Sequence, residues 1–211
     1  MGRKRTDLAP RIVAAARERF LLEGVDGASL RAIAADAGTS IGMVYYYFRT
    51  KDELFFAVVE ATYSKVLADL TEACAADVAP KERLRRLYRR IGAIDELEGK
   101  TLRLVIREVL VSSRRLDTLV ARFQRGHLPL VLTAIRDGML DGSIRDDRSP
   151  WIALFATFAV GAGPQFAAAA VGERLGLGLP RGDALADLLV ELLWTGIGRT
   201  DAPEFAVARK K

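Results

Sequence analysis

The sequence is poor in the residue types on which enzymes and metal sites depend. Its 211 residues include one cysteine, Cys74, and one histidine, His127. A single cysteine excludes an intramolecular disulfide and fits a reducing cytoplasm, where we expect the protein to reside. One cysteine and one histidine also leave no ligand set spaced for zinc and little for nucleophilic catalysis. We therefore expect no metal, no cofactor and no enzymatic activity.

Three other kinds of segment are not expected. The first ten residues are basic but hold no apolar stretch of the kind that a secretory leader requires. Residues 176–182 are rich in glycine but follow no predicted strand, so they fit a loop rather than a phosphate-binding site. Residues 151–172 are uncharged and long enough to span a bilayer. Pro164, Gln165 and the many small residues favour a buried interface helix there instead.

The most informative segment that is present begins at Ser29. Apolar residues recur at helical spacing over residues 30–37, and Ser29 is a good N-cap for that helix. Gly38 then permits a left-handed turn. Thr39 and Ser40 are both suited to cap the helix that follows. Two short helices joined by a turn that contains glycine place the second helix in a DNA major groove.

The second helix of this pair leads into a third. Val44 and Phe48 lie four residues apart, so both reach the core beneath the second helix. Thr50 and Glu53 form a capping box that opens the third helix. Lys51 lies in its first turn, beside free N–H groups that suit a phosphate.

At these positions the chain resembles the TetR family of bacterial transcriptional regulators. The matching residues are Ile33, Ala34, Ala37, Gly38, Thr39, Ser40, Gly42, Tyr45, Tyr47, Phe48, Lys51 and Leu54. Beyond about residue 60 only the number and length of the helices are compatible. We expect an all-α fold of about nine helices with three regions. These are a three-helix helix-turn-helix DNA-binding domain at 1–53, a helical ligand-binding and dimerisation domain at 54–200, and a flexible tail at 201–211.

The resemblance assigns residues to a DNA interface. Tyr46 is expected to face the groove, whereas Ile41 and Met43 are placed to touch thymine methyl groups and Gly42 permits close approach. Phosphate contacts, which set register rather than sequence preference, are expected from tyrosine hydroxyls and lysine. The expected DNA-binding residues are Arg31, Thr39, Ser40, Ile41, Gly42, Met43, Tyr45, Tyr46, Tyr47 and Lys51. The alternative is that the tyrosines are partly buried packing residues.

The remaining helices are predicted from apolar periodicity and caps. The first runs from Leu8 to Leu22, with Asp7 as its cap, and the helix opened by Thr50 runs to Ala76. Others are predicted at residues 80–94, 99–113, 116–140 and 182–197, and one begins at Ser149 and Pro150. Within residues 99–113 the predicted buried face is Leu102, Val105, Ile106, Val109 and Leu110. Pro129 predicts a kink at residues 125–128.

Basic residues are concentrated away from the helix-turn-helix. Residues 81–125 hold thirteen Lys or Arg against six Asp or Glu, whereas residues 1–51 hold nine against five. The run at 81–90 fits a nucleic-acid footprint. We favour an amphipathic helix whose arginines are solvated, namely Arg83, Arg86, Arg89 and Arg90.

Candidate ligand contacts lie in the middle helices. His127 either contacts a ligand or bonds a carbonyl that the kink frees. Gln165 either bonds across a dimer or points into a cavity. Tyr88, Phe123 and Phe158 have core spacing and equally suit the wall of an apolar pocket, the usual form of a small-molecule site. The resemblance implies such a pocket among these helices.

The last two predicted helices are too apolar for a small domain. A four-helix bundle made by two copies would cover them, and the resemblance implies the same. The expected interface residues are Trp151, Phe155, Leu185, Leu188, Leu189 and Leu192. The leading hypothesis is a dimeric transcriptional repressor that a small, largely apolar ligand releases from a palindromic operator. The alternatives are a constitutive or architectural DNA-binding regulator without a ligand, and a helical protein-interaction module whose helix-turn-helix is vestigial.

Overall fold

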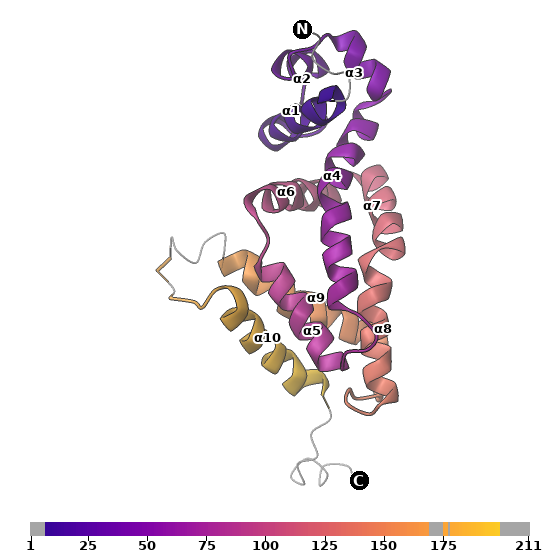
Figure 1. Cartoon of the computed structure of the whole chain (residues 1–211), viewed down its shortest axis with the longest axis vertical. Coiled ribbons are helices and arrows are strands. Elements are labelled where there is room, and N and C mark those ends of the chain that lie inside the picture. Colours follow the sequence, from indigo (N-terminus) through magenta and orange to yellow (C-terminus); the bar gives the residue numbers. More distant parts are fainter. Residues whose placement is uncertain (1–6, 169–174, 177, 199–211) are drawn as a thin grey trace. The chain divides into compact units, whose positions relative to one another are not determined.

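The named secondary-structure elements are all helices in the part of the chain that the structure, a computed structural model, describes: residues 7–168, 175–176 and 178–198. The expected all-α class is confirmed (Figure 1). The described residues form ten helices, one more than the expected nine: α1 (Leu8–Glu23), α2 (Leu30–Asp36), α3 (Ile41–Tyr47), α4 (Lys51–Ala73), α5 (Pro80–Gly92), α6 (Glu96–Val111), α7 (Ser113–Arg125), α8 (His127–Leu140), α9 (Pro150–Ala167) and α10 (Gly182–Ile197). None of the helices in these ranges has the length and apolar character that crossing a membrane requires.

The helices form two compact units. The N-terminal unit comprises residues 1–68 and 95–124, and the C-terminal unit comprises residues 69–94 and 125–211. Helix α4 begins in the first unit and ends in the second, as its predicted length required. The units do not divide at residue 53, because α6 and most of α7 belong with the helix-turn-helix. The functional domains at 1–53 and 54–200 stay a prediction, and the tail at 201–211 lies outside the described residues.

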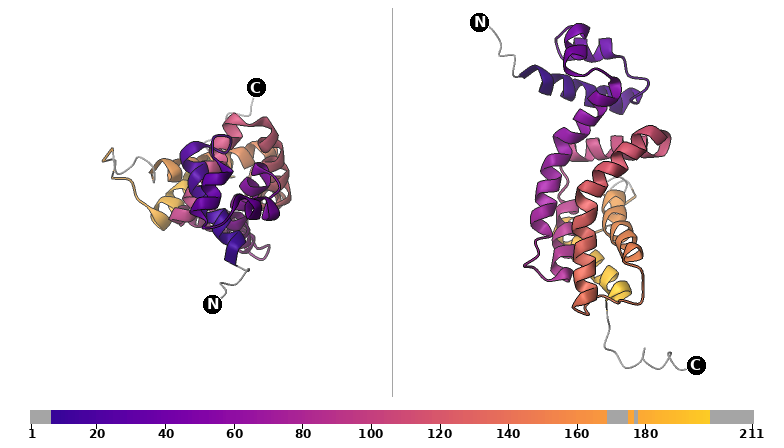
Figure 2. Two further views of the ribbon diagram at one scale, coloured as in Figure 1. Left: turned by 90° about the horizontal axis from the view of Figure 1, so that it is seen from above. Right: turned by 90° about the vertical axis from the view of Figure 1, so that its right-hand side faces the viewer.

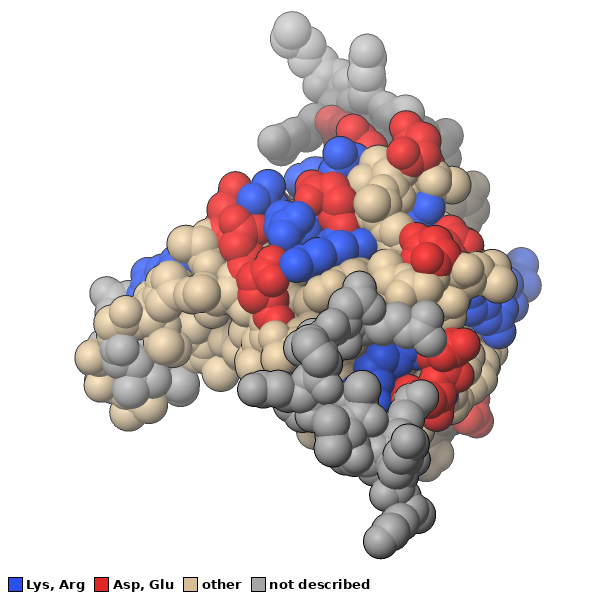
Figure 3. Space-filling view, turned by 90° about the horizontal axis from the view of Figure 1, so that it is seen from below, with Lys and Arg blue, Asp and Glu red and all other residues tan. Residues whose placement is uncertain are grey.

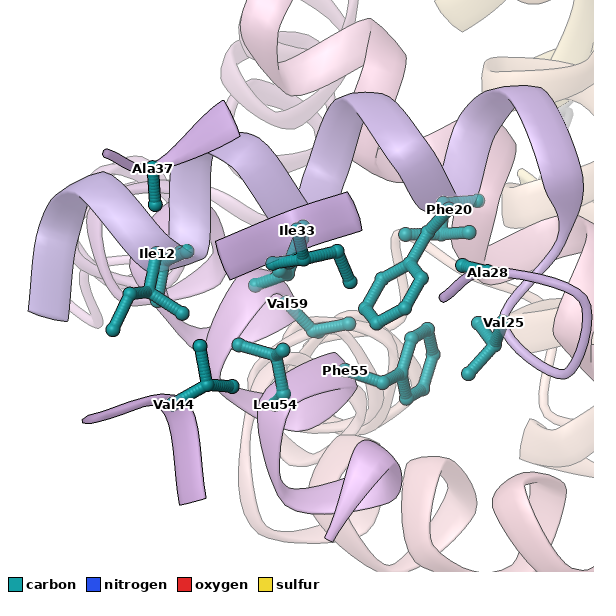
Figure 4. Packing of buried hydrophobic residues seen from close by; sticks show 14 of the residues in the cluster. Ile12, Phe20, Val25, Ala28, Ile33, Ala37, Val44, Leu54, Phe55 and Val59 are labelled. Atoms are coloured by element: carbon teal, nitrogen blue, oxygen red, sulfur yellow. The ribbon is translucent and has the colours of Figure 1, made fainter. Parts of the chain in front are cut away.

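The core of the N-terminal unit lies where α1 to α4 meet. Phe20 of α1 and Phe55 of α4 are fully buried and lie side by side, with Val25 from the intervening loop next to them (Figure 4). Val44 of α3 is also fully buried and lies beside Leu54 (Figure 4). Burying one such side chain contributes about 1.5–3 kcal/mol. This cluster therefore fixes α3 to the rest of the unit.

Helix α6 buries only part of the predicted face: Val105 is buried and Val109 packs against the core, as expected. Ile106 and Leu110 were expected inside but are 45% and 79% exposed, whereas Leu104 and Glu108 are buried. Buried polar contacts stabilise this orientation of α6. The hydroxyl of Thr101 lies 2.9 Å from that of Thr62, and the carboxylate of Glu108 accepts a hydrogen bond from Arg115. Apolar periodicity does not detect such pairs, so the prediction was wrong for Ile106 and Leu110.

The helix predicted at 116–140 is two helices that meet at Gly126. The break lies within the predicted range of residues 125–128, where α7 ends at Arg125 and α8 begins at His127. Pro129 falls in the first turn of α8, where no N–H is needed for the helix ladder. The proline thus starts a new helix rather than bending a continuous one.

In the C-terminal unit, α10 packs against α5 and α9 (Figures 1 and 2). Tyr88 of α5 is fully buried, and its hydroxyl donates to the carbonyl of Thr157 on α9 at 2.7 Å. Its ring lies on Gly161, where a Cβ would stand 2.0 Å from a ring carbon. The absence of a side chain at Gly161 is therefore what lets α5 approach α9.

The arginines predicted to be solvated on α5 are largely paired. Arg83 is 4% exposed and donates to the carbonyls of Ala76 and Val78 and to the carboxylate of Asp137. Arg90 lies 2.7 Å from Asp69. The prediction of a solvated face was wrong for these residues, because the loop before α5 and two neighbouring helices supply acceptors that the local sequence does not reveal.

A second set of cations on α5 pairs with α10. Lys81 and Arg85 lie 2.8 and 3.2 Å from the carboxylate of Glu191, and Arg89 lies 2.9 Å from that of Asp187. Basic and acidic side chains are interleaved on the face shown in Figure 3. The positive charge of residues 81–90 is therefore used within the unit, which favours a structural role over a nucleic-acid footprint.

Candidate nucleic-acid interface

The turn between α2 and α3 is built as the sequence predicted. The hydroxyl of Ser29 accepts from the N–H of Ala32 and caps α2. Gly38 has a φ of +62°, and the N–H groups of Gly38 and Thr39 donate to the carbonyls of Ala35 and Ala34. This is a Schellman motif, which requires a left-handed residue after the helix. It fixes the direction in which α3 leaves α2.

Side-chain caps also fix the start of α3 and the start of α4. Of the two candidates, Ser40 is the cap of α3, because its hydroxyl accepts from the N–H of Met43. At the start of α4, the hydroxyl of Thr50 accepts from the N–H of Glu53 at 3.0 Å. The Glu53 carboxylate accepts from the N–H of Arg49 at 2.7 Å rather than from that of Thr50. The capping box is therefore present with its return bond moved by one residue. At α1, in contrast, Asp7 makes no side-chain cap, because its backbone is helical.

The residues of α3 divide into a buried and an exposed set. Val44 is buried, and Phe48 packs against the same core, as predicted. Tyr46 is 74% exposed and Tyr45 is 49% exposed. Gly42 is exposed too, and the nearest atom that a Cβ there would meet is the Ser40 hydroxyl at 3.8 Å. The exposed strip of α3 therefore has aromatic side chains beside a position that has none.

The other predicted DNA-binding residues range from half-buried to exposed. Ile41 and Tyr47 are half-buried and pack against the hydrophobic cluster, and the Tyr47 ring meets that of Tyr46 edge-on at 5.3 Å. Thr39 and Met43 are also half-buried. Arg31 at the start of α2, like Ser40, is exposed.

Lys51 has a partner that the sequence did not suggest. Its ammonium donates to the main-chain carbonyl of Asp26, in the loop before α2, at 2.7 Å. An ammonium carries three donors, so two remain for other acceptors. Lys51 thus holds the loop and still presents positive charge at the start of α4.

Arginines remote in sequence brace the helix-turn-helix. Arg11 of α1 donates to the carbonyl of Ala37 at the end of α2. Arg19 of α1 binds the carboxylate of Asp36 through two nitrogens. Arg115 of α7 binds carboxylates of the loop, of α4 and of α6. No sequence pattern revealed these pairs, since charged residues on a helix surface are usually solvated.

The candidate ligand residues fall in both units. Phe123 lies in the N-terminal unit, where its ring packs 5.9 Å from that of Tyr63. In the C-terminal unit His127 is half-buried, and its ring meets that of Phe158 edge-on at 5.7 Å. Burial lowers the pKa of His127 to about 4, so the imidazole is neutral at physiological pH.

Gln165 is buried against α5. Its amide nitrogen donates to the carbonyls of Tyr88 and Gly161 at 3.0 and 2.8 Å. Its carbonyl oxygen is buried, has no hydrogen-bond partner, and faces the backbone of Gly92. Gln165 therefore joins α9 to α5 within one chain.

A cavity of about 190 Å³ lies elsewhere in the C-terminal unit, between α8, α9 and α10. Its wall is mostly apolar and includes Ile144, Val160 and Leu193, with Arg145 and Arg148 as its charged members. None of the predicted ligand residues lines it. Within the described residues no cluster of histidine, cysteine and acidic side chains is arranged to hold a metal ion.

The predicted interface residues also divide. On α9, Trp151 is 51% and Phe155 is 70% exposed, and on α10 Leu188 and Leu192 are similarly exposed. Leu185 and Leu189 are buried within the unit. The last two described helices thus each expose large apolar side chains, whereas the two buried leucines belong to the core of their own chain.

Comparison with known proteins agrees with this geometry. Residues 12–58 match the model of the bacterial regulatory proteins of the tetR family. The HTH-type transcriptional regulator PksA of Bacillus subtilis is 37% identical over 76 residues, which are 36% of this chain and 37% of that protein. The chain thus spans little more than a third of this curated relative.

Solved structures extend the likeness to the whole fold. A protein from Mesorhizobium loti described as a TetR-family transcriptional regulator is 27% identical, with a TM-score of 0.61 over 93% of this chain and all of that one. The transcriptional regulator FadR of Bacillus subtilis, solved in complex with stearoyl-CoA, is 19% identical, with a TM-score of 0.71 over 89% of this chain and 98% of that one. Residues 12–58 thus match the tetR family's regulatory proteins at the helix-turn-helix, and the described fold is similar to that of TetR-family transcriptional regulators.

Proposed function

We propose that the protein is a dimeric cytoplasmic repressor of transcription that leaves a palindromic operator when it binds a small, largely apolar ligand. The observation that carries DNA binding is the exposed strip of α3. Tyr45 and Tyr46 stand out from the helix beside Gly42, while Val44 holds the opposite face in the core. A rigid helix with an open, aromatic outer face suits a major groove.

The strip has few groups that read bases through hydrogen bonds. Gly42 permits close approach, Met43 offers an apolar contact to thymine methyl groups, and Tyr46 is 74% exposed. Lys51, Arg31 and the tyrosine hydroxyls supply phosphate contacts. Affinity therefore rests mainly on the backbone of the DNA, and selectivity on close fit and on the spacing of two recognition helices.

Fluorescence anisotropy with DNA from the promoter of the protein's own locus tests DNA binding. Lys51→Ala should weaken binding to every sequence and lower the slope of log Kd against log salt by about 0.9, because one phosphate contact is lost. Tyr46→Ala should weaken binding to promoter DNA more than to unrelated DNA. If both variants bind like the wild type, the helix-turn-helix is vestigial and the chain is a protein-interaction module.

The exposed apolar surface of α9 and α10 supports a homodimer. Phe155, Trp151, Leu188 and Leu192 would be covered by the same surface of a second copy. Phe155→Glu should yield a monomer in light scattering, because it buries an unpaired carboxylate at the interface. Leu140→Glu is the control, since Leu140 is 87% exposed at the end of α8. If Phe155→Glu remains a dimer, the interface lies elsewhere.

The ligand is supported by the apolar cavity between α8, α9 and α10 and by the FadR complex with stearoyl-CoA. A ligand that favours a conformation with the wrong spacing of recognition helices lowers DNA affinity by the ratio of its affinities for the two states. Native mass spectrometry of protein purified from its host measures any bound small molecule. Protein that carries none, and whose DNA affinity no apolar extract of the host changes, is a constitutive regulator.

A further inference from the structure

We propose that Arg115 is a positioning residue for DNA binding: it clamps the loop before α2 to the start of α4 and so places the ammonium of Lys51 at the DNA backbone. The proposal rests on the proposed function, because it takes Lys51 as a phosphate contact. Arg115 lies on α7, 64 positions beyond Lys51 in the sequence. All residues involved belong to the N-terminal unit.

Arg115 binds three carboxylates at once. Its side chain is 3% exposed, and Nε donates to Asp52 at 2.9 Å. Nη1 donates to Glu108 at 2.6 Å and to Asp26 at 3.2 Å, and Nη2 donates to the other oxygen of Asp26. The guanidinium therefore holds Asp26 as a two-bond fork, the strongest arrangement that arginine offers a carboxylate.

The three carboxylates come from three different elements. Asp26 lies in the loop between α1 and α2, Asp52 in the first turn of α4, and Glu108 on α6. Arg114 adds a second cation, 2.5 Å from Asp52. The hydrogen bond from Arg115 lowers the pKa of Asp26 below its ordinary value. One buried guanidinium thus fixes the helix-turn-helix to α6 and α7.

Asp26 links this cluster to Lys51. Its side chain is bound by Arg115, and its main-chain carbonyl accepts from the Lys51 ammonium at 2.7 Å. With the loop fixed, the long lysine side chain is ordered before DNA arrives, and two of its N–H donors remain free for phosphate. Ordering a side chain in advance lowers the entropy lost on binding. Without the clamp the carbonyl moves, and the lysine loses its anchor.

Asp26→Ala separates this role from simple electrostatics. The Asp26 side chain is 81% exposed, so its removal leaves Arg115 paired with Asp52 and Glu108 and the core intact. Removing a negative charge near DNA strengthens binding if electrostatics alone acts. Loss of the anchor for Lys51 weakens it. The two explanations therefore predict changes of opposite sign.

The experiment measures Kd for promoter DNA by anisotropy between 50 and 200 mM salt. We expect Asp26→Ala to weaken binding and to lower the salt slope toward that of Lys51→Ala. Raising the salt from 50 to 200 mM lowers the affinity of every variant for DNA. For a variant that has lost one full phosphate contact, the factor by which affinity falls should be about 3.5 times smaller than for the wild type. In the double variant, Asp26→Ala should add no further change to Lys51→Ala, because both act on the same contact.

Arg115→Met tests the clamp itself, and Arg83→Met is its matched control. Arg83 is also a buried arginine bound to a carboxylate, but it lies in the C-terminal unit. Both changes should lower the melting temperature, whereas only Arg115→Met should lower the salt slope of the folded protein. If Arg115→Met prevents folding, Asp26→Ala and the double variant decide the question alone.

Binding by Asp26→Ala that equals or exceeds that of the wild type overturns the proposal. So does an additive loss in the double variant. Failure of the proposed function is a different result, in which the wild type shows no sequence preference, or Lys51→Ala leaves affinity and salt slope unchanged.

Discussion

One methyl group added at Gly42 should change protein stability and DNA affinity in opposite directions. In α3 a Cβ at this position would meet only the Ser40 hydroxyl, at 3.8 Å, which is an ordinary van der Waals distance. Gly42→Ala therefore introduces no strain in the free protein. Alanine is favoured over glycine inside a helix by about 0.8–1.0 kcal/mol. We expect the variant to be more stable by about this amount, which raises the melting temperature by roughly 2–4 °C.

The same methyl group should weaken DNA binding. It stands on the exposed face of α3 beside Tyr46, where the account requires the backbone of the helix to approach the duplex. Displacing the helix enough to admit the methyl group should cost at least about 1.4 kcal/mol, which is a tenfold rise in Kd. The assays are thermal unfolding and anisotropy on one preparation.

Ala61→Gly is the reverse control for Gly42→Ala. Ala61 is an exposed residue in α4, so this variant should lose stability and bind promoter DNA like the wild type. If Gly42→Ala binds promoter DNA with unchanged affinity, α3 does not approach the duplex at this position, and the assignment of its exposed strip to the major groove is refuted.

Two further variants test the C-terminal unit. Gly161→Ala should destabilise the protein by about 3 kcal/mol in urea denaturation, because the new Cβ would stand 2.0 Å from the buried ring of Tyr88; a loss below about 1 kcal/mol would mean that α5 and α9 separate easily. Burial lowers the pKa of His127 to about 4 in the folded protein, whereas an exposed histidine in the unfolded chain has a pKa of about 6.5. Between these pH values the unfolded chain therefore binds a proton that the folded chain excludes. Stability should therefore fall as pH drops from 6.5 to 4, by up to about 3 kcal/mol, and His127→Gln should remove that part of the pH dependence; an unchanged pH profile of the variant would contradict the burial of the imidazole.

The local features of the fold were predictable because neighbours in the sequence determine them. Ser29, Gly38 and Ser40 act within a few residues of their partners, and the structure confirms each. The break near Pro129 was predictable for the same reason, since a proline disrupts only the turn in which it lies.

The pairs that join distant segments were not predictable. Arg115 and Asp26 are 89 residues apart, and nothing in either neighbourhood distinguishes them from solvated charges. Part of the buried face of α6 was missed because it contains Glu108, which a search for apolar periodicity places outside. Ion pairs between helices have no repeat in the sequence, so only the packed structure shows which charges are structural.

We propose that two copies of α3 read a palindrome in double-stranded DNA. Footprinting of the promoter of the protein's own locus, with wild type and Phe155→Glu side by side, tests this proposal. We expect the wild type to protect an inverted repeat with half-site centres about 10 base pairs or a multiple apart, and the monomeric variant to give little protection. Protection without an inverted repeat, or no protection even at low salt, would contradict it.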